Sequence, residues 1–348
     1  MKKKASFFVL ITVIFTFYGQ KPKSFTIRTI AFYNLENLFD TENDPEKNDE
    51  ASPIMEIREN RKKIYNDKID KLSEVILQIG KEKTKTSPAI LGVAEIENKK
   101  VLEDLVASNK LKKKNYEIIH VDSPDKRGID VALLYQSRCF KPIYYEAFNP
   151  NIFDQNKKVY TRDILLVSGY LDDEFIHIIV NHWPSRRGGV QKTRPFREKA
   201  AYKVKQIIER IKLKELNPKI IIMGDFNDNP SDSSFKNVLK TKSKKKNIIK
   251  NDIYNPYEDM FRRGFGTLVH RDQINLFDQI MITSPFLTEK KNHFSNYKMF
   301  KSGIFNKLFL TQKSGRYKGY PYRSFSKGKY IGGYSDHYPV YLYLVKEK

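Results

Sequence analysis

The sequence predicts an α/β protein, and three observations support that prediction. Short runs rich in β-branched and aromatic residues recur along the chain, and amphipathic stretches with helical spacing lie between them. The 348 residues are 40% hydrophobic and include 21 Tyr and 23 Phe, which is ample for a substantial core. No internal repeat and no linker rich in Pro, Gly or Ser divides the chain. We therefore expect a single domain with enough strands for two sheets.

Nine segments have the length and composition of strands, and two have the apolar spacing of helices. The expected strands are residues 26–33, 89–94, 116–121, 131–135, 164–170, 175–181, 219–223, 279–283 and 338–345. The helical stripes are Leu72, Val75, Ile76 and Ile79, and then Ala201, Val204, Ile208 and Ile211.

The N-terminus predicts an export signal. Three lysines at positions 2–4 precede an apolar run, residues 7–18, which is too short to cross a bilayer. We expect a signal peptide over residues 1–19, a mature domain over residues 20–348, and a secreted or periplasmic protein. Cys139 is the single cysteine, so an intramolecular disulfide is excluded. No cysteine stands directly after the apolar run, which argues against a lipid anchor.

The chain is strongly basic, with 64 Lys and Arg against 41 Asp and Glu and a net charge of +23. Such a charge favours a polyanionic partner, either nucleic acid or an anionic surface. The alternative is a lysine-rich composition without a functional meaning. One segment stands out, because residues 290–335 contain eleven basic residues, eleven aromatics and no acid. We expect an insertion at about residues 284–334 that binds substrate, with a solvated surface loop as the alternative.

Polar residues lie at the ends of most predicted strands, where an open α/β sheet gathers its ligands. Carboxylates and amides are oxygen ligands suited to Mg²⁺ or Mn²⁺, and His and Asn can stabilise the charge on a phosphate. Taken singly, each residue has an ordinary explanation as a surface residue, helix cap or structural histidine. The occurrence of all these residues together, in this order along the chain, is a more specific signal of a phosphoryl-transfer site than any one of them. The set is Asn34, Glu36, Glu95, Asp130, His182, Asp225, Asn227, Asp278, Asp336 and His337.

These motifs resemble those of the endonuclease/exonuclease/phosphatase superfamily. This group includes pancreatic-type deoxyribonucleases, apurinic endonucleases, inositol polyphosphate 5-phosphatases and bacterial sphingomyelinases. The resemblance covers residues 26–345, and Gly-Asp-Phe-Asn at 224–227 and Ser-Asp-His at 335–337 are its most specific parts. Asn-Leu-Glu-Asn-Leu-Phe at 34–39, Glu-Ile-Glu-Asn at 95–98 and Arg-Gly-Ile-Asp at 127–130 resemble the bacterial extracellular-endonuclease branch.

The resemblance implies a four-layer α/β sandwich, in which two mixed sheets pack face to face with helices outside. It implies a divalent metal, Mg²⁺ or Mn²⁺, held mainly by Glu95 with Asn34 and Asp336. Asp225 then corresponds to the residue that orients or deprotonates the attacking water, and Asn227 to one that holds a phosphate oxygen.

The resemblance also implies two phosphate-facing histidines. His337 would contact the phosphate with its tautomer set by Asp278, and His182 resembles the second histidine. The carboxylate partner of His182 does not align, and Asp130 is the substitute that we expect. Arg162 is a further expected phosphate contact. The remaining histidines are expected to be structural, namely His120, His177, His270 and His293.

The catalytic set alone does not choose a substrate, because nucleases, phosphatases and lipases of the superfamily share it. The basic charge and the aromatics favour nucleic acid. We therefore expect a sequence-nonspecific endonuclease that cuts DNA or RNA as a monomer, with no stable protein partner. The alternatives are a phosphatase or phosphodiesterase for another phosphate ester, such as a phospholipid or sugar phosphate, and a non-enzymatic binding module.

Overall fold

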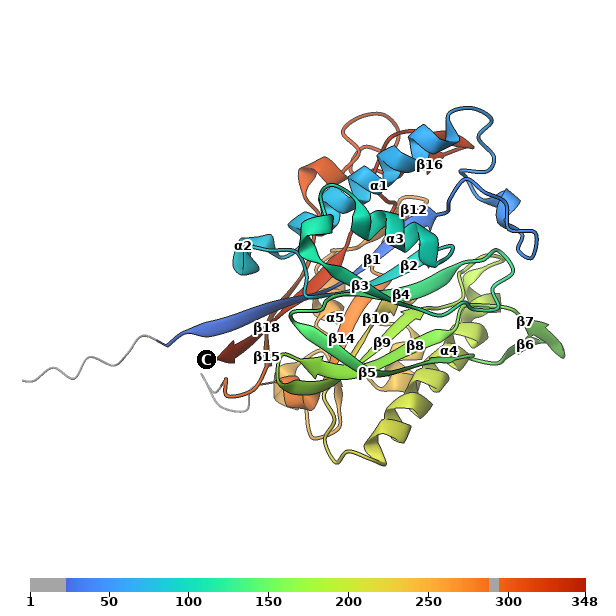
Figure 1. Ribbon diagram of the computed structural model, residues 1–348. Coiled ribbons are helices and arrows are strands. Elements are labelled where there is room, and N and C mark those ends of the chain that lie inside the picture. The colour runs from blue at the N-terminus through green and yellow to red at the C-terminus, as the bar shows by residue number, and fades with distance from the viewer. Residues whose placement is uncertain (1–22, 288–293) are drawn as a thin grey trace, which may run out of the picture.

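The computed structural model describes residues 23–287 and 294–348, and Figure 1 gives the labels of its elements. The expected signal peptide, residues 1–19, and His293 lie outside these described residues. No helix in the described ranges combines the length and the apolar character needed to cross a membrane.

Two six-stranded sheets form the centre of the molecule. In spatial order the first contains β15 (Lys298–Ile304), β18 (Val340–Glu347), β1 (Phe25–Leu38), β2 (Ile90–Ile96), β4 (Asp130–Gln136) and β3 (Tyr116–His120). The second contains β11 (Ile253–Tyr254), β14 (Asp278–Thr283), β10 (Ile220–Asp225), β9 (Glu174–His182), β8 (Ile164–Leu171) and β5 (Phe140–Phe148). Both sheets are mixed, because β1 with β2 and β9 with β10 are parallel pairs among antiparallel neighbours.

Helices and short hairpins complete the described chain. The α-helices are α1 (Arg61–Gln78), α2 (Lys81–Thr84), α3 (Lys99–Ala107), α4 (Val190–Lys212) and α5 (Tyr257–Arg262). The hairpins pair β6 (Ile152–Asp154) with β7 (Lys157–Val159), β12 (Leu268–His270) with β13 (Gln273–Asn275), and β16 (Phe325–Ser326) with β17 (Lys329–Tyr330). A π-helix spans Ser234–Leu239, and 3-10 turns span Asp49–Ala51, Lys112–Lys114, Lys245–Asn247, Ser284–Phe286 and Leu308–Leu310.

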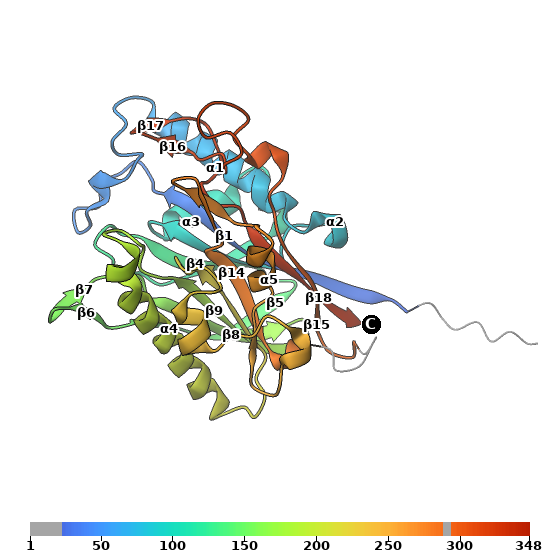
Figure 2. The ribbon, with the colours of Figure 1, turned by 180° about the vertical axis from the view of Figure 1, so that it is seen from behind.

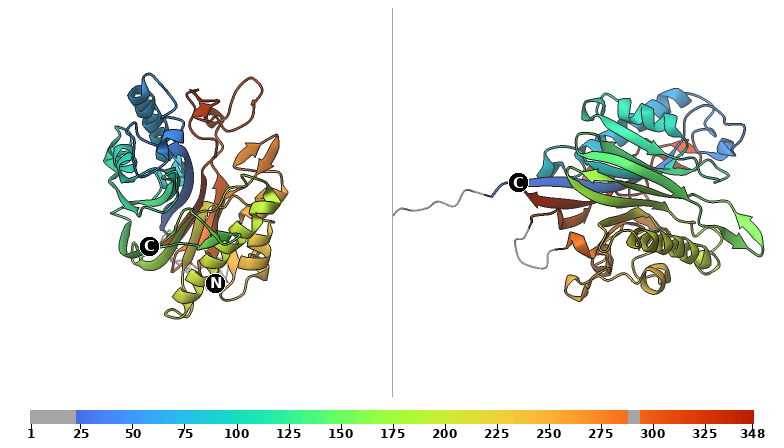
Figure 3. Two further views of the ribbon diagram at one scale, coloured as in Figure 1. Left: turned by 90° about the vertical axis from the view of Figure 1, so that its right-hand side faces the viewer. Right: turned by 60° about the horizontal axis from the view of Figure 1, so that its bottom comes forward.

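The alternation of side chains along each strand divides the core into layers. Ile30 and Phe32 of β1 belong to the cluster between the sheets, whereas Ala31 and Tyr33 belong to the cluster that joins the first sheet to α1 and α3. The order helix, sheet, sheet, helix is visible in Figure 1 and edge-on in Figure 3. The predicted four-layer sandwich is therefore confirmed.

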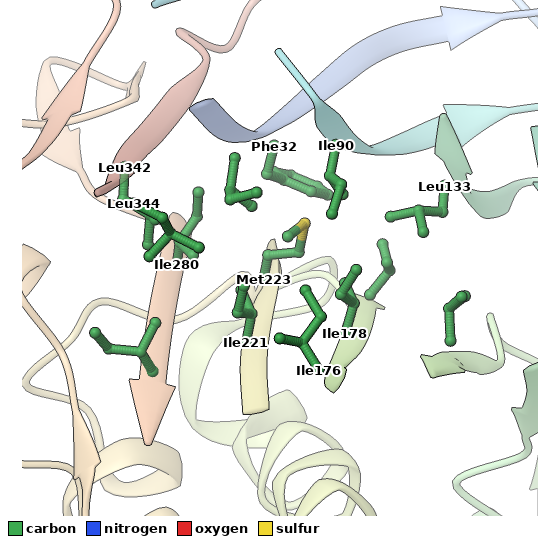
Figure 4. Packing of buried hydrophobic residues seen from close by; sticks show 14 of the residues in the cluster. Phe32, Ile90, Leu133, Ile176, Ile178, Ile221, Met223, Ile280, Leu342 and Leu344 are labelled. Atoms are coloured by element: carbon green, nitrogen blue, oxygen red, sulfur yellow. The ribbon is translucent and has the colours of Figure 1, made fainter. Parts of the chain in front are cut away.

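Each sheet contributes one apolar face to the central layer. Figure 4 shows Phe32 and Ile90 of the first sheet opposite Met223 and Ile178 of the second. The outer face of the second sheet is covered by α4, whose stripe includes Val204. This packing holds the two sheets rigidly enough for residues from both to share one site.

All nine predicted strands and both helical stripes are present in the structure. Of the twelve strands in the two six-stranded sheets, the prediction missed the edge strands β5, β11 and β15, of which β11 has only two residues. In β5 most side chains are at least partly exposed and Pro142 interrupts the run, so its pattern lacks the buried alternation on which the prediction rests. In β15, Lys298 and Lys301 dilute the apolar signal in the same way.

The basic aromatic segment is not one insertion. Residues 298–304 form β15, which pairs with β18 and is part of the first sheet. Residues 288–293 lie outside the described residues, and residues 305–335 contain the β16–β17 hairpin and bury Phe305, Leu310 and Phe325. Residues 305–335 pack beside α1, as Figure 2 shows. Many of its aromatics therefore belong to the core, and the idea of a surface insertion applies only to residues 305–335.

We expect Gly224→Ala to destabilise the protein by about 1–3 kcal/mol, because overpacking of a tight core has this cost. A Cβ at Gly224 would lie 2.3 Å from the backbone oxygen of Asn181 in the neighbouring strand, and backbone cannot turn aside. The matched control is Gly303→Ala, where the nearest atom is the movable hydroxyl of Tyr341 at 2.7 Å. Urea unfolding of both variants tests this, and an equal loss for the two would contradict the expectation.

Candidate functional site

The site forms where the ends of strands from both sheets meet. Asn34 lies in β1 and Glu95 in β2, both of the first sheet. In the second sheet Asp225 ends β10, with His182 of β9 and Asp278 of β14 as its register neighbours on either side. His182, Asp225 and Asp278 thus lie side by side on three adjacent strands, because the strand register pairs them.

Two irregularities in the first sheet shape its side of the site. The pairing of β1 with β2 shifts between Asn34 and Leu38, and the pairing of β2 with β4 shifts between Ala94 and Ile96. Glu95 has a φ of 60° and Glu36 a φ of 49°, in the left-handed region that is costly for such residues. Bulges of this kind commonly re-aim side chains beside functional sites. Here the carboxylate of Glu95 accepts the backbone N–H of Asn37 at 3.0 Å.

Asp225 is the centre of the cluster. Its Oδ2 accepts a hydrogen bond from the Asn34 amide at 3.1 Å, which joins the two sheets. The same oxygen lies 3.6 Å from Nε2 of His182 and 4.0 Å from Nε2 of His337. Its other oxygen accepts the backbone N–H of Asn227 at 3.0 Å. The side chain of Asp225 is buried, so these contacts hold it in one orientation.

His337 and Asp278 form the predicted pair across the two sheets. Nδ1 of His337 lies 2.7 Å from Oδ2 of Asp278, so the carboxylate accepts the Nδ1 proton. Burial lowers the pKa of His337, but the attraction of Asp278, Asp225 and Asp336 outweighs burial and raises that pKa well above the usual value. His337 is therefore held as a cation with Nε2 directed towards Asp225.

His182 has the opposite character. Burial, followed by the charges of Arg162 and Arg127, lowers the pKa of His182 well below the usual value, so this imidazole is neutral. Its Nε2 lies 3.9 Å from Oε1 of Glu95, and its Nδ1 has no hydrogen-bond partner in the described chain. The site thus contains one neutral and one cationic histidine.

The residues present fit a hard divalent cation. Within the described residues, groups of carboxylates and histidines close enough to share an ion include Glu95, His182 and Asp225, and also Asp225, Asp278 and His337. Burial together with Asp278 and Glu95 raises the pKa of Asp225 to about 7, against the opposing effect of His337. A bound cation would reduce the repulsion between these neighbouring carboxylates.

The expected metal ligands keep atoms available for that cation. Oε1 of Glu95 and Oδ1 of Asp336 accept no hydrogen bond from any described residue, and these two carboxylates are the more exposed acids of the cluster. Asn34 donates its amide N–H to Asp225, and its amide oxygen accepts the backbone N–H of Glu36 at 2.9 Å. Glu95 and Asp336, with Asn34 beside them, would hold Mg²⁺ or Mn²⁺, which bind through few carboxylates and several waters.

Two expected site residues do not take their predicted places. Asp130 is not the partner of His182, because its carboxylate accepts from the backbone and hydroxyl of Ser123 and lies 2.9 Å from His120. The register places Asp130 of β4 opposite Ile96 of β2, in the first sheet and on the strand next to the one that carries Glu95.

Arg162 does not face a phosphate either. It is buried, and its guanidinium donates to Asp125 at 3.1 Å and to the backbone oxygens of His182 and Trp183 at 3.2 and 2.5 Å. With its donors directed into the protein, Arg162 supports the backbone that carries His182. The prediction that Arg162 lies near the site is correct, but Arg162 contacts the backbone of a site residue where a contact with the substrate was expected.

Asn227 belongs to a loop that the structure holds firmly. Its amide donates to the backbone oxygen of Trp183 at 3.0 Å, and its own backbone oxygen accepts from Arg186 at 2.7 Å. The next residue, Asp228, pairs with the buried Arg197 at 2.5 Å. Neither arginine was predicted, and only their proximity in the fold reveals them.

A buried polar network beside the site was also missed. Glu36 accepts the backbone N–H of Ser324 at 2.6 Å, and Lys68 of α1 donates to the hydroxyl of Ser324 at 2.7 Å. Burial raises the pKa of Glu36 to about 7 and lowers that of Lys68 to about 8. This network fixes the chain beside Arg323, which pairs with Asp336 at 2.9 Å. In the sequence, Lys68 is indistinguishable from a surface lysine.

Comparison with known proteins gives one family match and several structural likenesses. A family model described as "Endonuclease/Exonuclease/phosphatase family" matches residues 29–346. A Bacteroides thetaiotaomicron structure of an endonuclease/exonuclease/phosphatase family protein has 17% identity and a TM-score of 0.55, covering 93% of this chain and 96% of that one. The B. thetaiotaomicron mannosyl-6-phosphatase has 16% identity and a TM-score of 0.53, with coverages of 91% and 99%.

D. rerio TDP2 complexed with a single-strand DNA product has 13% identity and a TM-score of 0.52, covering 92% of this chain and 99% of that one. These likenesses show a shared fold. Comparison with curated protein sequences gives no match.

We expect His337→Ala and Asp278→Asn to lower hydrolysis of bis-p-nitrophenyl phosphate each by about 10²–10⁴-fold, as for loss of a positioned acid or base. The double variant should lose no more than the larger single loss, because both changes disable one unit. Independent, multiplying losses would contradict this. The matched control is His177→Asn, which breaks a His–carboxylate contact of 2.8 Å with Glu215 at the far end of β9 and should retain turnover.

Proposed function

Because the chain belongs to the endonuclease/exonuclease/phosphatase family, we propose that it is a divalent-metal-dependent phosphodiesterase that acts as a sequence-nonspecific endonuclease on DNA or RNA. The observation that carries the proposal is the buried cluster around Asp225, where carboxylates from both sheets meet one neutral and one cationic histidine. This donor set suits the metal-assisted hydrolysis of a phosphate ester.

The residues of the chain divide the work by position. Asp225 is oriented by Asn34 and Asn227, so its carboxylate is placed to accept a proton from water. His337, cationic and held by Asp278, would donate an Nε2 hydrogen bond to a phosphate oxygen and offset the charge that grows there. His182 faces the same space as a neutral group. A metal bound by Glu95, Asp336 and Asn34 would polarise the phosphate and lower the pKa of water.

The surroundings favour nucleic acid over a small phosphate ester. The chain carries a net charge of +23, and Arg323 of the basic segment contacts Asp336 at the site itself. A polyanion gains from such a surface through neutralised phosphates and released counterions. A single-strand DNA product occupies the similarly folded D. rerio TDP2. The alternative is a phosphatase or phosphodiesterase for another ester. The mannosyl-6-phosphatase, which has a similar fold, supports this alternative.

We further propose that the protein is exported, acts as a monomer outside the cytoplasm, and falls in the bacterial extracellular-endonuclease branch of the family. Support comes from the basic and apolar residues of the N-terminus and from the Asn-Leu-Glu-Asn-Leu-Phe, Glu-Ile-Glu-Asn and Arg-Gly-Ile-Asp motifs. N-terminal sequencing of the protein from the culture medium or periplasm tests the export. A retained Met1 in a cytoplasmic fraction would contradict it.

We expect hydrolysis of plasmid DNA and RNA to stop in EDTA and to return with Mg²⁺ or Mn²⁺. Glu95→Gln should lower turnover at least about 100-fold, because a metal site contributes several kcal/mol to the transition state and each 1.36 kcal/mol is tenfold. Glu103→Gln, an exposed change on α3, is the control and should retain activity.

The same assay should include a phosphomonoester and sphingomyelin. Activity on these with none on nucleic acid would replace the endonuclease proposal by the alternative. Undiminished hydrolysis in EDTA would contradict metal dependence altogether.

A further inference from the structure

We propose that two cavities on either side of the β12–β13 hairpin form a two-part track for a single polynucleotide strand, with the scissile phosphate between them. The inference rests on the proposed function and deepens it, because it names the form of the substrate. A monoester would need a cavity on one side of the phosphate, whereas a strand continues on both sides.

The first cavity has a volume of about 700 Å³ and lies between the start of α4 and the hairpin. Arg186, Arg187 and Arg271 line it together with His270, and none of its described lining residues is acidic. Arg187 and Arg271 are exposed, so their charges are available to a ligand. Arg186 lies over the ring of Phe277 at 4.5 Å and is held in place by Asp228 and Asp232.

The second cavity has a volume of about 440 Å³ and lies between the same hairpin and residues 312–331. Its walls include Arg316, Tyr317 and Arg323, and it shares His270 and Arg271 with the first cavity. Asp272 is the acid among its described lining residues, and Arg316 neutralises it at 2.7 Å. Tyr317 is 48% exposed and offers a flat aromatic face, which is what an unpaired base stacks on.

Both cavities adjoin the catalytic cluster. Asn227, whose backbone N–H bonds to Asp225, lines the first cavity. Arg323, which bonds to Asp336, lines the second. Each cavity thus reaches a residue that bonds to the catalytic cluster, at Asn227 in the first and at Arg323 in the second.

The hairpin between the cavities is fixed to the catalytic pair. Thr267, buried at its base, accepts the backbone N–H of Tyr338 at 2.8 Å, and its hydroxyl accepts that of Asp278 at 3.3 Å. At its tip Asp272 bonds to Tyr320 and Arg316 of the basic segment. The hairpin thus sets the positions of Arg271 and Arg316 relative to His337, which lies next to Tyr338.

A third cavity shows that this lining is not general. It has a volume of about 560 Å³ between α1, α3 and the loop after β1. Its walls carry Asp40, Glu42, Asp70 and Asp104 against Lys62 and Lys100. A polyanion would be repelled there, so a basic lining is not shared by every cavity of the described chain. Two other basic cavities, one lined by Lys242 and Lys244 and one by Lys205 and Arg210, include no residue bonded to the catalytic cluster.

The test measures binding and turnover separately. In a Glu95→Gln background, Kd for a fluorescein-labelled 12-nucleotide single strand is measured at several salt concentrations. The double variant Arg187→Ala/Arg271→Ala should raise Kd at least about tenfold, and the slope of log K against log salt should fall by about 0.7 for each lost phosphate contact. Tyr317→Ala should weaken binding and Tyr317→Phe should restore it, because only the aromatic face is needed.

The matched control is Lys113→Ala/Lys205→Ala, which removes the same charge from exposed residues that line neither cavity. With Glu95 intact, the arginine variant should lose at least about tenfold more kcat/KM on the 12-mer than on bis-p-nitrophenyl phosphate. Equal losses on both substrates would mean that these arginines support the fold, and losses matched by the lysine control would mean a nonspecific effect of charge. Either result overturns the track while leaving the proposed nuclease activity intact.

A wild-type protein that hydrolyses the small diester but no nucleic acid would instead overturn the proposed function, and the track with it.

Discussion

The hydrogen bond from the Asn34 amide to Asp225 joins the two sheets at the point where the chemistry is concentrated. It is buried, so water does not compete with it, and an unpaired partner on either side would carry the full cost of desolvation. The contact between His337 and Asp278 spans the same boundary. Both depend on the sheet-to-sheet distance set by the apolar layer around Phe32 and Met223. The site is thus a product of how the two sheets pack, and no single motif could form it.

Burial gives this cluster its electrostatic character. A low-dielectric environment penalises charge, so His182 loses its proton readily while His337 keeps one only because Asp278 and other acids surround it. The same burial raises the pKa of Asp225. The two histidines both lie about 4 Å from Oδ2 of Asp225. Their different neighbours make His182 neutral and His337 cationic. A divalent cation between Glu95 and Asp336 would complete the balance of charge.

The surroundings connect this centre to the rest of the surface. The Glu36–Lys68–Ser324 network anchors the basic segment to β1 and α1 from within, and the hairpin at Thr267 is anchored to the backbone beside the catalytic pair. Segments that look like loops in the sequence are therefore held by buried polar contacts. Such anchoring explains how exposed arginines far apart in the chain can be placed with a definite position relative to one phosphate.

The amino-acid sequence by itself determined the α/β class, nine of the strands, both main helices and the family motifs, because each is encoded in local periodicity or in a contiguous run of residues. It also identified the members that meet around Asp225, since these follow buried strands. Only the tertiary structure decided which side chains touch. Asp130 pairs with His120, and Arg162 turns inward to the backbone of His182, because register and packing direct them there. The buried state of Lys68 likewise depends on residues more than 250 positions away, a distance at which local pattern carries no information.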